Sequence, residues 1–347
     1  MLDVLLKIGA DRHRGWTDVK VMRSSYELAD SFQIGLSQLP GAQAVPAVKP
    51  GDACELWVDD LLLVTGFVDR RVVNYEMKVH QVMISGRSKA GDLVDCLHPG
   101  LTFNRQSLAQ IIRRLASDFG IDVAVDAAVA RRSAEPFETA KIAEGESYHE
   151  FFQRLASYRA VLVTSTATGD LLLSGAPSDY VDAHLSPDNV LKAAGEFDHS
   201  ARFYSYLVRS QTDDTNLFSD DILVQGYSID DSIRPSRSTL IQSDQAIDQA
   251  GCERLAQWYR NTAIGQSSSI RYIVQGWYAK PGILWAPRQL VRVSDPLMGI
   301  DDTRVISGVL FLLDDDGVRA ELSVTHPAGF DLVALPQPEP DDDGALF

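Results

Sequence analysis

Near the C-terminal end of the chain, from Arg271 to Pro327, hydrophobic and polar residues alternate in four runs with turn residues between them. A period of two is typical of β-strands that bury one face, and the many Val, Ile, Leu and aromatic residues suit a pleated surface. In the last run Val318, Ala320, Leu322 and Val324 alternate with Arg319, Glu321 and Ser323. We therefore predict a small antiparallel barrel or sandwich, with strands over 271–278, 283–295, 304–313 and 318–325.

The first 97 residues show the same period of two. Two of the runs, 54–58 and 61–68, are separated only by Asp59 and Asp60, which is typical of a tight hairpin. Several short strands in fewer than 100 residues indicate a compact barrel. Residues 1–97 are therefore predicted to form a first β-barrel domain. Its strands are expected over 2–8, 16–22, 31–37, 54–58, 61–68, 72–76 and 77–85.

Residues 98–180 change to a helical period. Over 104–119 the apolar residues fall on one helical face, and Gly120 supplies a stop. A capping box from Ser147 to Glu150 starts a second amphipathic helix. Each helix is followed by a short strand, over 121–125 and 160–166, and a hairpin over 160–174 ends the segment. We predict a small α/β insert domain.

The strand pattern returns over 181–332, with the runs just described and with candidate strands at 203–209 and 222–226. One helix is expected in this region, over 244–263 and capped by Asp244. These residues are predicted to form a second β-barrel domain that exchanges strands with the first, and its limits near 180–230 are open. The last segment, 333–347, is acidic and rich in Pro, so we expect disorder there.

The fold class that follows is α+β and mostly β, with two small antiparallel β-barrel domains and an α/β insert. A chain of 347 residues is long enough for two or three domains. No apolar run approaches the roughly 18 residues of a spanning helix, and Asp3 stands where a signal peptide carries positive charge. We therefore expect assembly in a cytoplasm without membrane insertion by this chain.

The formal net charge of −16 argues against general affinity for nucleic acid, because phosphate binding requires Lys and Arg to displace counterions. It is compatible with a surface past which nucleic acid slides without adhering. The aromatic group Phe203, Tyr204 and Tyr206 could stack on bases. Its flanks are not basic, however, and aromatic residues that alternate along a strand more often lie in a core or a subunit interface.

Candidate catalytic and metal-binding patterns point to structural roles. Cys54, Cys96 and Cys252 are far apart and odd in number, so they predict no disulfide framework. Asp314-Asp-Asp-Gly317 resembles part of a calcium loop, but an EF-hand would place ligands at Leu312 and Ser323, so a hairpin turn is expected. The sequence holds no G-x-S-x-G, H-E-x-x-H or C-x-x-C. We therefore predict no catalytic residues, no metal and no cofactor.

Two further features have a functional and a structural interpretation. The glycine-bearing stretch from Gly86 to Cys96 follows a strand and could cradle phosphate, but it fits neither common glycine-rich motif, so a structural turn is expected. His149 lies in the first turn of the second predicted helix, where a solvated or capping role is expected rather than catalysis.

An ordered set of short motifs resembles one known family. Gly15-Trp16 lies early in the first β domain, and Gly86–Cys96 follows its last strand. Gly276-Trp277 precedes Leu284-Trp-Ala-Pro287, and Leu322-Ser-Val-Thr-His-Pro327 closes the second β domain. Together with residues 291–295 and 305–309 they resemble the baseplate hub protein of Mu-like contractile phage tails, over about residues 1–330. Arg288 departs from this pattern, in which Asn is expected after Trp-x-Pro.

The resemblance implies a family that is structurally akin to the hub of T-even phages and to the base of the type VI secretion spike. It implies a homotrimer whose six barrels form a pseudo-hexameric ring that adapts a sixfold tail tube to a threefold central spike. The implied partners are the spike, the tail tube protein and other baseplate proteins, with DNA only in transit through the lumen. The implied location is the baseplate of the virion tail, after assembly in the host cytoplasm.

Three alternatives stay open at this point. The same architecture would serve as the hub of a tail-like bacteriocin or a secretion device. A tail-associated cell-wall hydrolase or esterase would act on peptidoglycan. A monomeric carbohydrate-binding module is suggested by Trp16, Trp57, Trp277 and Trp285, although buried barrel aromatics explain the same residues.

Overall fold

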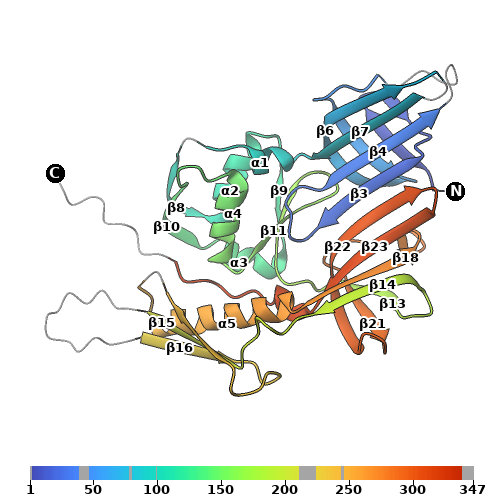
Figure 1. The fold of residues 1–347 in the computed structure, drawn as a ribbon. Coiled ribbons are helices and arrows are strands. Elements are labelled where there is room, and N and C mark those ends of the chain that lie inside the picture. Colours follow the sequence, from blue (N-terminus) through green and yellow to red (C-terminus); the bar gives the residue numbers. More distant parts are fainter. Residues whose placement is uncertain are drawn as a thin grey trace, which may run out of the picture.

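The structure is a computed structural model that describes residues 2–38, 47–77, 80–98, 100–210, 224–243 and 246–337. Over these residues the fold is α+β and mostly β. Figure 1 shows two β lobes stacked beside an α/β insert, with a long helix and a small sheet below the insert. Within the described ranges no helix is both long and apolar enough to cross a membrane.

The N-terminal lobe is an open sheet in the order β3-β4-β7-β6-β5-β1-β2. The predicted hairpin is confirmed, because β5 and β6 pair around Asp59 and Asp60. The separate strands expected over 61–68 and 72–76 are wrong, because β6 runs on through both. A one-residue bulge at Asp69 shifts the register with β7 without ending the ladder. The strands are β1 (Val4–Ile8), β2 (Asp11–His13), β3 (Asp18–Ser24), β4 (Ser31–Gln38), β5 (Ala53–Val58), β6 (Leu61–Tyr75) and β7 (His80–Ser88).

The C-terminal lobe is a second sheet, in the order β14-β18-β23-β22-β21-β13. The single strand expected over 283–295 is wrong, because Pro287 and the positive φ of Arg288 (69°) separate β20 from β21. The strand expected from 304 begins instead at Ile300. The elements are β13 (Tyr180–Leu185), β14 (Val190–Phe197), β18 (Ser268–Gln275), β19 (Tyr278–Lys280), β20 (Ile283–Leu284), β21 (Leu290–Asp295), β22 (Ile300–Asp314) and β23 (Gly317–Thr325).

The two lobes are joined by one strand pair. Residues Gly308 to Leu313 of β22 pair antiparallel with Val19 to Ser24 of β3, which makes a continuous 13-stranded sheet. The hydrophobic side chains of both lobes form one buried cluster that includes the facing residues Val21 and Phe311. The ladders between described residues form an open sheet in each lobe, so barrel closure stays a prediction.

The α/β insert has its own hydrophobic core. Capping boxes begin both of its longer helices, at Ser107 with Gln110 and at Ser147 with Glu150. The helix expected from residue 104 therefore begins later, because Ser107 ends strand β8 and caps α2. The elements are α1 (Gly91–Asp95), β8 (Thr102–Ser107), α2 (Leu108–Ser117), β9 (Val123–Val125), η1 (Ala127–Val129), α3 (Ala130–Ser133), β10 (Pro136–Lys141), α4 (Tyr148–Ser157), β11 (Leu162–Ser165) and β12 (Leu171–Ser174).

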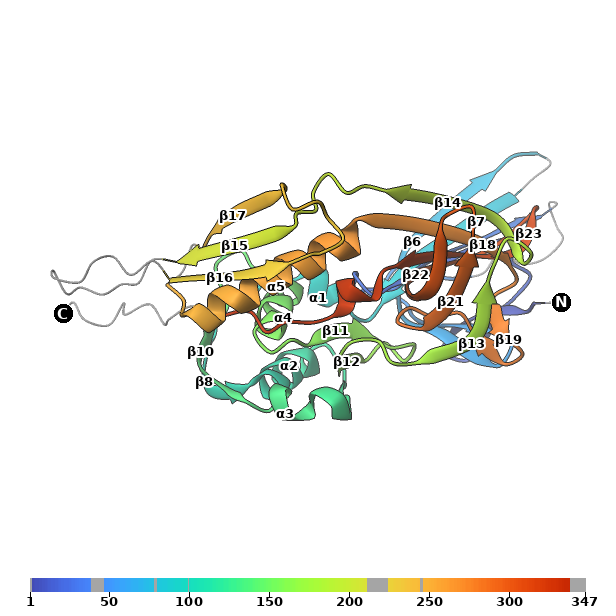
Figure 2. The same ribbon diagram turned by 90° about the horizontal axis from the view of Figure 1, so that it is seen from below.

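A third, smaller core lies between helix α5 (Gln249–Gln266) and a three-stranded sheet of β15 (Ser205–Ser210), β16 (Val224–Ile229) and β17 (Ser238–Gln242). Figure 2 shows these strands lying along one side of α5. The helix expected over 244–263 starts and ends later than predicted, because the side chain of Asp248 accepts the capping bond from the Gly251 amide. The expected cap, Asp244, lies outside the described residues, as does the polar loop at 212–216.

The segment after β23 returns across the molecule. The 3-10 helix η2 (Pro327–Phe330) packs against α5, with its Gly329 against Gly265. The chain then runs extended to residue 337, and the Leu335 amide donates to the carbonyl of Ser157 in the insert (3.0 Å). The disorder expected from residue 333 stays a prediction; the structure describes residues 333–337 and gives them this one bond to the insert. Residues 338–347 lie outside the described part of the chain.

Candidate functional site

The side chains with potential for chemistry differ in how far they are buried. Cys54 and Cys252 are buried and Cys96 is exposed, and burial raises the pKa of the Cys54 thiol to about 12, which keeps it in the thiol form. In the part of the chain that the structure describes, no group of three His, Cys, Asp or Glu side chains could hold a metal ion. His149 is half-buried in the first turn of α4.

Both sequence features that resembled ligand loops are turns. Asp314 and Gly317 are paired at the end of the β22–β23 hairpin, and the Asp314 carboxylate accepts two bonds from Arg319 (2.5 and 2.7 Å). The turn after β7 leads into the five-residue helix α1. There Arg87 binds Asp69 (2.8 Å) and Asp95 (2.7 Å). The turns expected in both segments are confirmed, and the absence of a bound ligand there stays a prediction.

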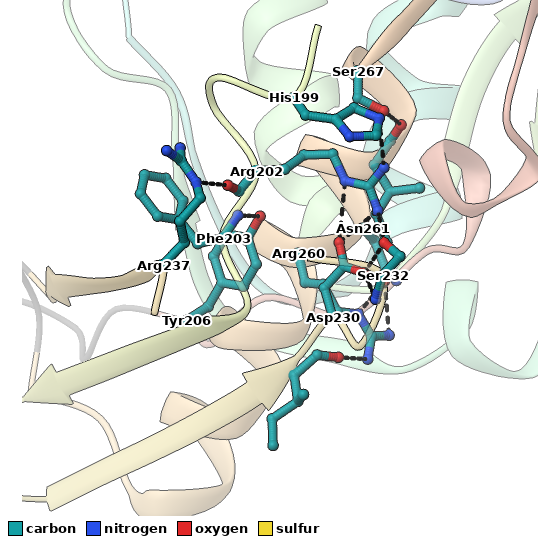
Figure 3. Close-up of polar contacts among 12 residues, drawn as sticks. His199, Arg202, Phe203, Tyr206, Asp230, Ser232, Arg237, Arg260, Asn261 and Ser267 are labelled. Carbon is teal, nitrogen blue, oxygen red and sulfur yellow. Dashed lines mark hydrogen bonds and ion pairs between the residues drawn. The ribbon is translucent and has the colours of Figure 1, made fainter. Parts of the chain in front are cut away.

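A cluster of polar contacts lies beside α5 (Figure 3). The Arg202 guanidinium donates to Asp230 Oδ2 through Nε (3.1 Å) and Nη2 (2.6 Å). Ser232 donates to Asp230 Oδ1 through its hydroxyl (2.5 Å) and its backbone amide (3.1 Å). Burial of Asp230 acts to raise its pKa, but the bonds from Ser232 and Arg202 outweigh that effect and hold the pKa below its usual range. The carboxylate is therefore a charged structural anchor.

The same cluster includes the aromatic residues that the sequence analysis considered for stacking. The Tyr206 ring is buried, and its hydroxyl accepts a bond from the Phe203 amide (3.0 Å). The Phe203 ring lies under the Arg237 guanidinium, 5.0 Å from its centroid, and Arg237 also donates to the Arg202 carbonyl (3.0 Å). Figure 3 shows these side chains turned toward one another. This arrangement holds the chain before β15 against the β16–β17 connection and leaves no open aromatic platform at Tyr206.

The tryptophans that suggested carbohydrate binding lie mainly inside the lobes. Trp16, Trp277 and Trp285 are all buried. The indole of Trp277 donates to the Leu312 carbonyl (2.9 Å), and that of Trp57 donates to Glu55 (2.9 Å). Burial in the lobes therefore accounts for Trp16, Trp277 and Trp285, whereas Trp57 is half-buried.

The two lobes are built on the same plan. The order β3-β4-β7-β6-β5-β1 in the first corresponds to β14-β18-β23-β22-β21-β13 in the second. In each lobe a 15-residue strand pairs with the preceding strand through its first half and with the following strand through its second half. Each long strand also carries a one-residue bulge, at Asp69 in β6 and at Ser307 in β22. One difference is that β13 pairs parallel with β21, whereas β1 and β5 are antiparallel.

Several strand edges have no ladder partner among the described residues, and two of them correspond to the edges that are paired between β22 and β3. The first is the outer edge of β14, which pairs only with β18. The second is the outer edge of residues 70–75 in β6, beyond the end of its pairing with β5. Unpaired edges of this kind attract other strands. Large apolar side chains are exposed along both of them, with exposed fractions of 56% for Leu191, 48% for Phe197 and 80% for Tyr75.

Strand β14 was not predicted from the sequence. Its residues from Leu191 to Phe197 are exposed on both faces, so no alternation of apolar and polar positions marks it. The available signal is an apolar segment of low net charge without Pro between residues 190 and 197, which is typical of an edge that another strand covers. We consider these two edges the candidate functional surface.

Three baseplate family descriptions match successive parts of the chain. Residues 3–88 match "Mu phage baseplate assembly protein GpP-like, N-terminal". Residues 90–175 match "Baseplate hub protein gp44-like, second domain". Residues 249–333 match "Mu phage baseplate assembly protein GpP, fourth domain".

Individual relatives agree with these matches. The baseplate hub protein gp44 of Escherichia phage Mu is 27% identical over 337 residues, which cover 94% of this chain and 88% of that protein. The 43 kDa tail protein of prophage MuSo2 from Shewanella oneidensis is 32% identical, with a TM-score of 0.84 over 95% of this chain and 100% of that one. The E. coli c3393 protein, a type VI secretion component, shares the fold at 12% identity, with a TM-score of 0.59 over 96% of this chain and 80% of that one.

Proposed function

The chain belongs to the family of Mu-like phage baseplate hub proteins, and from this premise we propose that three copies form a ring that adapts a sixfold tail tube to a threefold central spike. The observation that carries the proposal is the common strand plan of the two lobes. Three chains with two equivalent lobes each would present six similar units on one side of the ring. On surfaces formed by the insert and α5, which occur once in each chain, the ring would have only threefold symmetry.

The domain assignment follows the same division. Residues 1–97 form the first tube domain and 181–332 the second, with α5 and its small sheet attached to the second. Residues 98–180 form the insert, which has a separate core, and 333–347 form the acidic tail. In this assignment the tube domains form the ring, and the insert lies outside it, facing other baseplate proteins.

The mechanism is mechanical. Open strand edges expose unpaired amide and carbonyl groups, and pairing with a neighbouring lobe satisfies those groups and completes the barrel walls. A head-to-tail contact of this kind closes into a ring when the rotation between copies permits. An obligate interface should bury on the order of 2,000 Å² or more.

Passage of DNA during ejection is the functional consequence. With a net charge of −16 for each chain, a lumen that receives part of this charge repels the phosphate backbone and lets DNA slide. A lumen lined mainly by Lys and Arg in the assembled ring would contradict this part of the proposal.

Two other functions are distinguished by separate tests. The hub of a tail-like bacteriocin or a secretion device would have the same ring but no genome to pass, and capsid genes beside this gene would argue against it. A cell-wall hydrolase would digest purified peptidoglycan. The engaged polar clusters described above supply no nucleophile paired with a base, so we expect no digestion.

The proposal is tested by the mass of the purified full chain in light scattering, with and without the candidate spike protein. The expected result is a species of three times the 38.2 kDa chain mass, which gains mass when the spike is added. A protein that stays monomeric at high concentration and with the spike present would overturn the ring.

A further inference from the structure

The contact between the two lobes of one chain supplies a template for the contact between chains. In this template the second half of β22, from Gly308 to Leu313, lies antiparallel to β3, with Gly308 opposite Ser24 and Phe311 opposite Val21. The side chains of Val21 and Phe311 are fully buried there. The pairing therefore contributes core as well as ladder hydrogen bonds.

The common strand plan identifies the counterparts of both template strands. The counterpart of β22 is β6, and the aligned bulges at Ser307 and Asp69 place Arg70 at the position of Gly308. The counterpart of β3 is β14. The matching ladders of β3 with β4 and of β14 with β18 place Gly195 at the position of Val21.

Each of these two counterparts carries an edge that has no ladder partner among the described residues. We propose that β14 of one copy pairs antiparallel with residues 70–77 of the next copy, in the register of the β22–β3 junction. This inference rests on the proposed ring and specifies how its subunits join. In that register Arg70 lies opposite Asp198, Val73 opposite Gly195 and Glu76 opposite Lys192.

Two charge pairs and one apolar pair match in this register, whereas Arg71 lies opposite Phe197 and Val72 opposite Glu196. Arg70 meets Asp198 at one end, and Glu76 meets Lys192 toward the other, so both charge pairs are of opposite sign. Next to Glu76, Met77 lies opposite Leu191; these side chains are 95% and 56% exposed in the single chain. Their contact would remove a large apolar area from water.

A shift of one residue in either direction destroys this match. Displaced one way, Glu76 faces Ala193 and Met77 faces Lys192. Displaced the other way, Glu76 faces Leu191. Either shift also turns the strand faces over, although Arg71 then meets Asp198 or Glu196. The register is therefore given by the β22–β3 template, and the pairs of Arg70 with Asp198 and Glu76 with Lys192 are compatible with it.

The pairing also explains why β14 is exposed on both faces in the single chain. A strand that bridges two subunits receives its covering side chains from the neighbouring lobe. Because the contact joins different surfaces of each copy, it repeats head to tail. Intrachain β22–β3 junctions and interchain β6–β14 junctions then alternate, and three copies give six junctions around the ring.

The test uses cysteines at Asn74 and Ala194, two exposed positions that face each other in the proposed register. Directly opposed residues of an antiparallel pair lie about 4.5–5.5 Å apart between Cα atoms, within reach of a disulfide. The full chain carrying N74C and A194C, with the exposed Cys96 replaced by Ser, is expected to form interchain disulfides on mild oxidation. The N74C and A194C single variants are expected to form none between these strands.

The matched control combines N74C with K192C. Residue 192 is on the same face as 194 but about 7 Å further along the strand, so no disulfide is expected. A trimer in light scattering that cross-links only through 74 and 194 supports the pairing. A trimer without that cross-link, or with the control cross-link instead, overturns the pairing and leaves the ring intact. A monomer that never cross-links overturns both, and covalent products larger than three copies keep the pairing but exclude the closed ring.

Charge reversal gives a second readout that does not depend on oxidation. E76K is expected to raise the concentration at which the trimer half-dissociates by several-fold, because Lys would then face Lys192. Adding K192E in the same chain is expected to restore association. Equal weakening in the double variant would overturn the assignment of Glu76 to Lys192.

Discussion

The Tyr278 hydroxyl donates a hydrogen bond to Asp59 Oδ2 (2.5 Å) and so joins strand β19 of the C-terminal lobe to the β5–β6 turn of the N-terminal lobe, 219 residues away in sequence. Asp59 is held for this contact by Asp3. The Asp59 amide donates to the Asp3 carbonyl (2.8 Å), and Asp59 Oδ1 accepts from the Asp3 amide (3.1 Å). Burial, followed by the adjacent Asp59 carboxylate, raises the pKa of Tyr278 to about 12. The link therefore holds the lobes together beyond the shared sheet.

Replacing Tyr278 by Phe is expected to lower the free energy of unfolding by about 1 kcal/mol at pH 8. The tyrosine pKa is higher in the folded chain than its usual value near 10, so this stabilisation is complete below pH 10. It is lost as the pH rises toward 12, because the unfolded chain releases the proton first. Urea unfolding of wild type and Y278F at pH 8 and pH 10.5 should show a smaller difference at the higher pH.

The control for this prediction is Tyr180, which is 56% exposed on β13. Y180F is expected to change the unfolding free energy by less than about 0.5 kcal/mol at either pH. A difference between wild type and Y278F that grows with pH would contradict the assigned role of the hydroxyl.

The buried ion pair of Arg202 and Asp230 should matter far more than ion pairs at the surface. Both residues are less than 10% exposed, so D230N would leave the Arg202 charge without its counterion. Breaking a buried pair costs roughly 3–5 kcal/mol, and we expect a loss of this size in urea unfolding at pH 7. Because the pKa of Asp230 is lowered in the fold, its contribution is present above about pH 4 and disappears in stronger acid.

The matched control is D301N. Asp301 accepts a bond from Arg292 (2.6 Å) in an exposed pair, and exposed pairs contribute about 0–1 kcal/mol. If D230N and D301N lowered the free energy of unfolding equally, burial would not explain how much Asp230 contributes to stability.

Local chemistry made the insert the most predictable part of the fold. The residues at Ser147 and Glu150 satisfy the first helical amides by themselves, so the motif predicts the helix start without knowledge of the tertiary structure. The start of α2 was missed because Ser107 also ends a strand that pairs with distant residues 136–141. The cap of α5 was missed because Asp244 and Asp248 both fit the pattern and only the structure identifies Asp248.

The candidate surface could not be read from alternation, since the side chains of β14 are not divided into a buried and an exposed face. The pairing of β22 with β3 was also beyond sequence reasoning, because nothing local links Phe311 to Val21. The presence of two lobes was predictable, because alternation of apolar and polar residues appears both before and after the insert. The equivalence of the two lobes was recognised only from the strand registers around the bulges at Asp69 and Ser307.

The crossing of α5 over η2 depends on two glycines. A Cβ added at Gly265 would lie 2.5 Å from the Cα of Gly329, a distance that requires backbone movement. Alanine inside a helix normally stabilises it relative to glycine by about 1 kcal/mol. We expect G265A to lower the unfolding free energy instead, by roughly 1–3 kcal/mol, as measured by thermal or urea unfolding.

An exposed position of the same helix supplies the reference for that substitution. Glu253 is exposed on α5, so E253A is expected to stay within about 0.5 kcal/mol of wild type. A G265A protein at least as stable as wild type would show that the two backbones separate without cost.

The start of η2 is capped by a histidine, which predicts a weakening of this segment in mild acid. His326 Nδ1 accepts a bond from the Ala328 amide (3.1 Å), and only an unprotonated Nδ1 can accept. Burial, followed by the charge of Arg304, lowers the pKa of His326 below its usual value near 6.5. The unfolded chain therefore takes up the proton first as the pH falls, so stability is constant above about pH 6.5 and decreases below it.

Replacing His326 by Asn separates the cap from its titration, because Asn can accept the same bond without binding a proton. We expect H326N to match wild type at pH 7.5 within about 0.5 kcal/mol and to exceed it by about 1 kcal/mol at pH 5. His149, whose pKa burial also lowers, is present in both proteins and cancels in the comparison. Parallel losses of unfolding free energy in wild type and H326N between pH 7.5 and 5 would assign the acid sensitivity to another group.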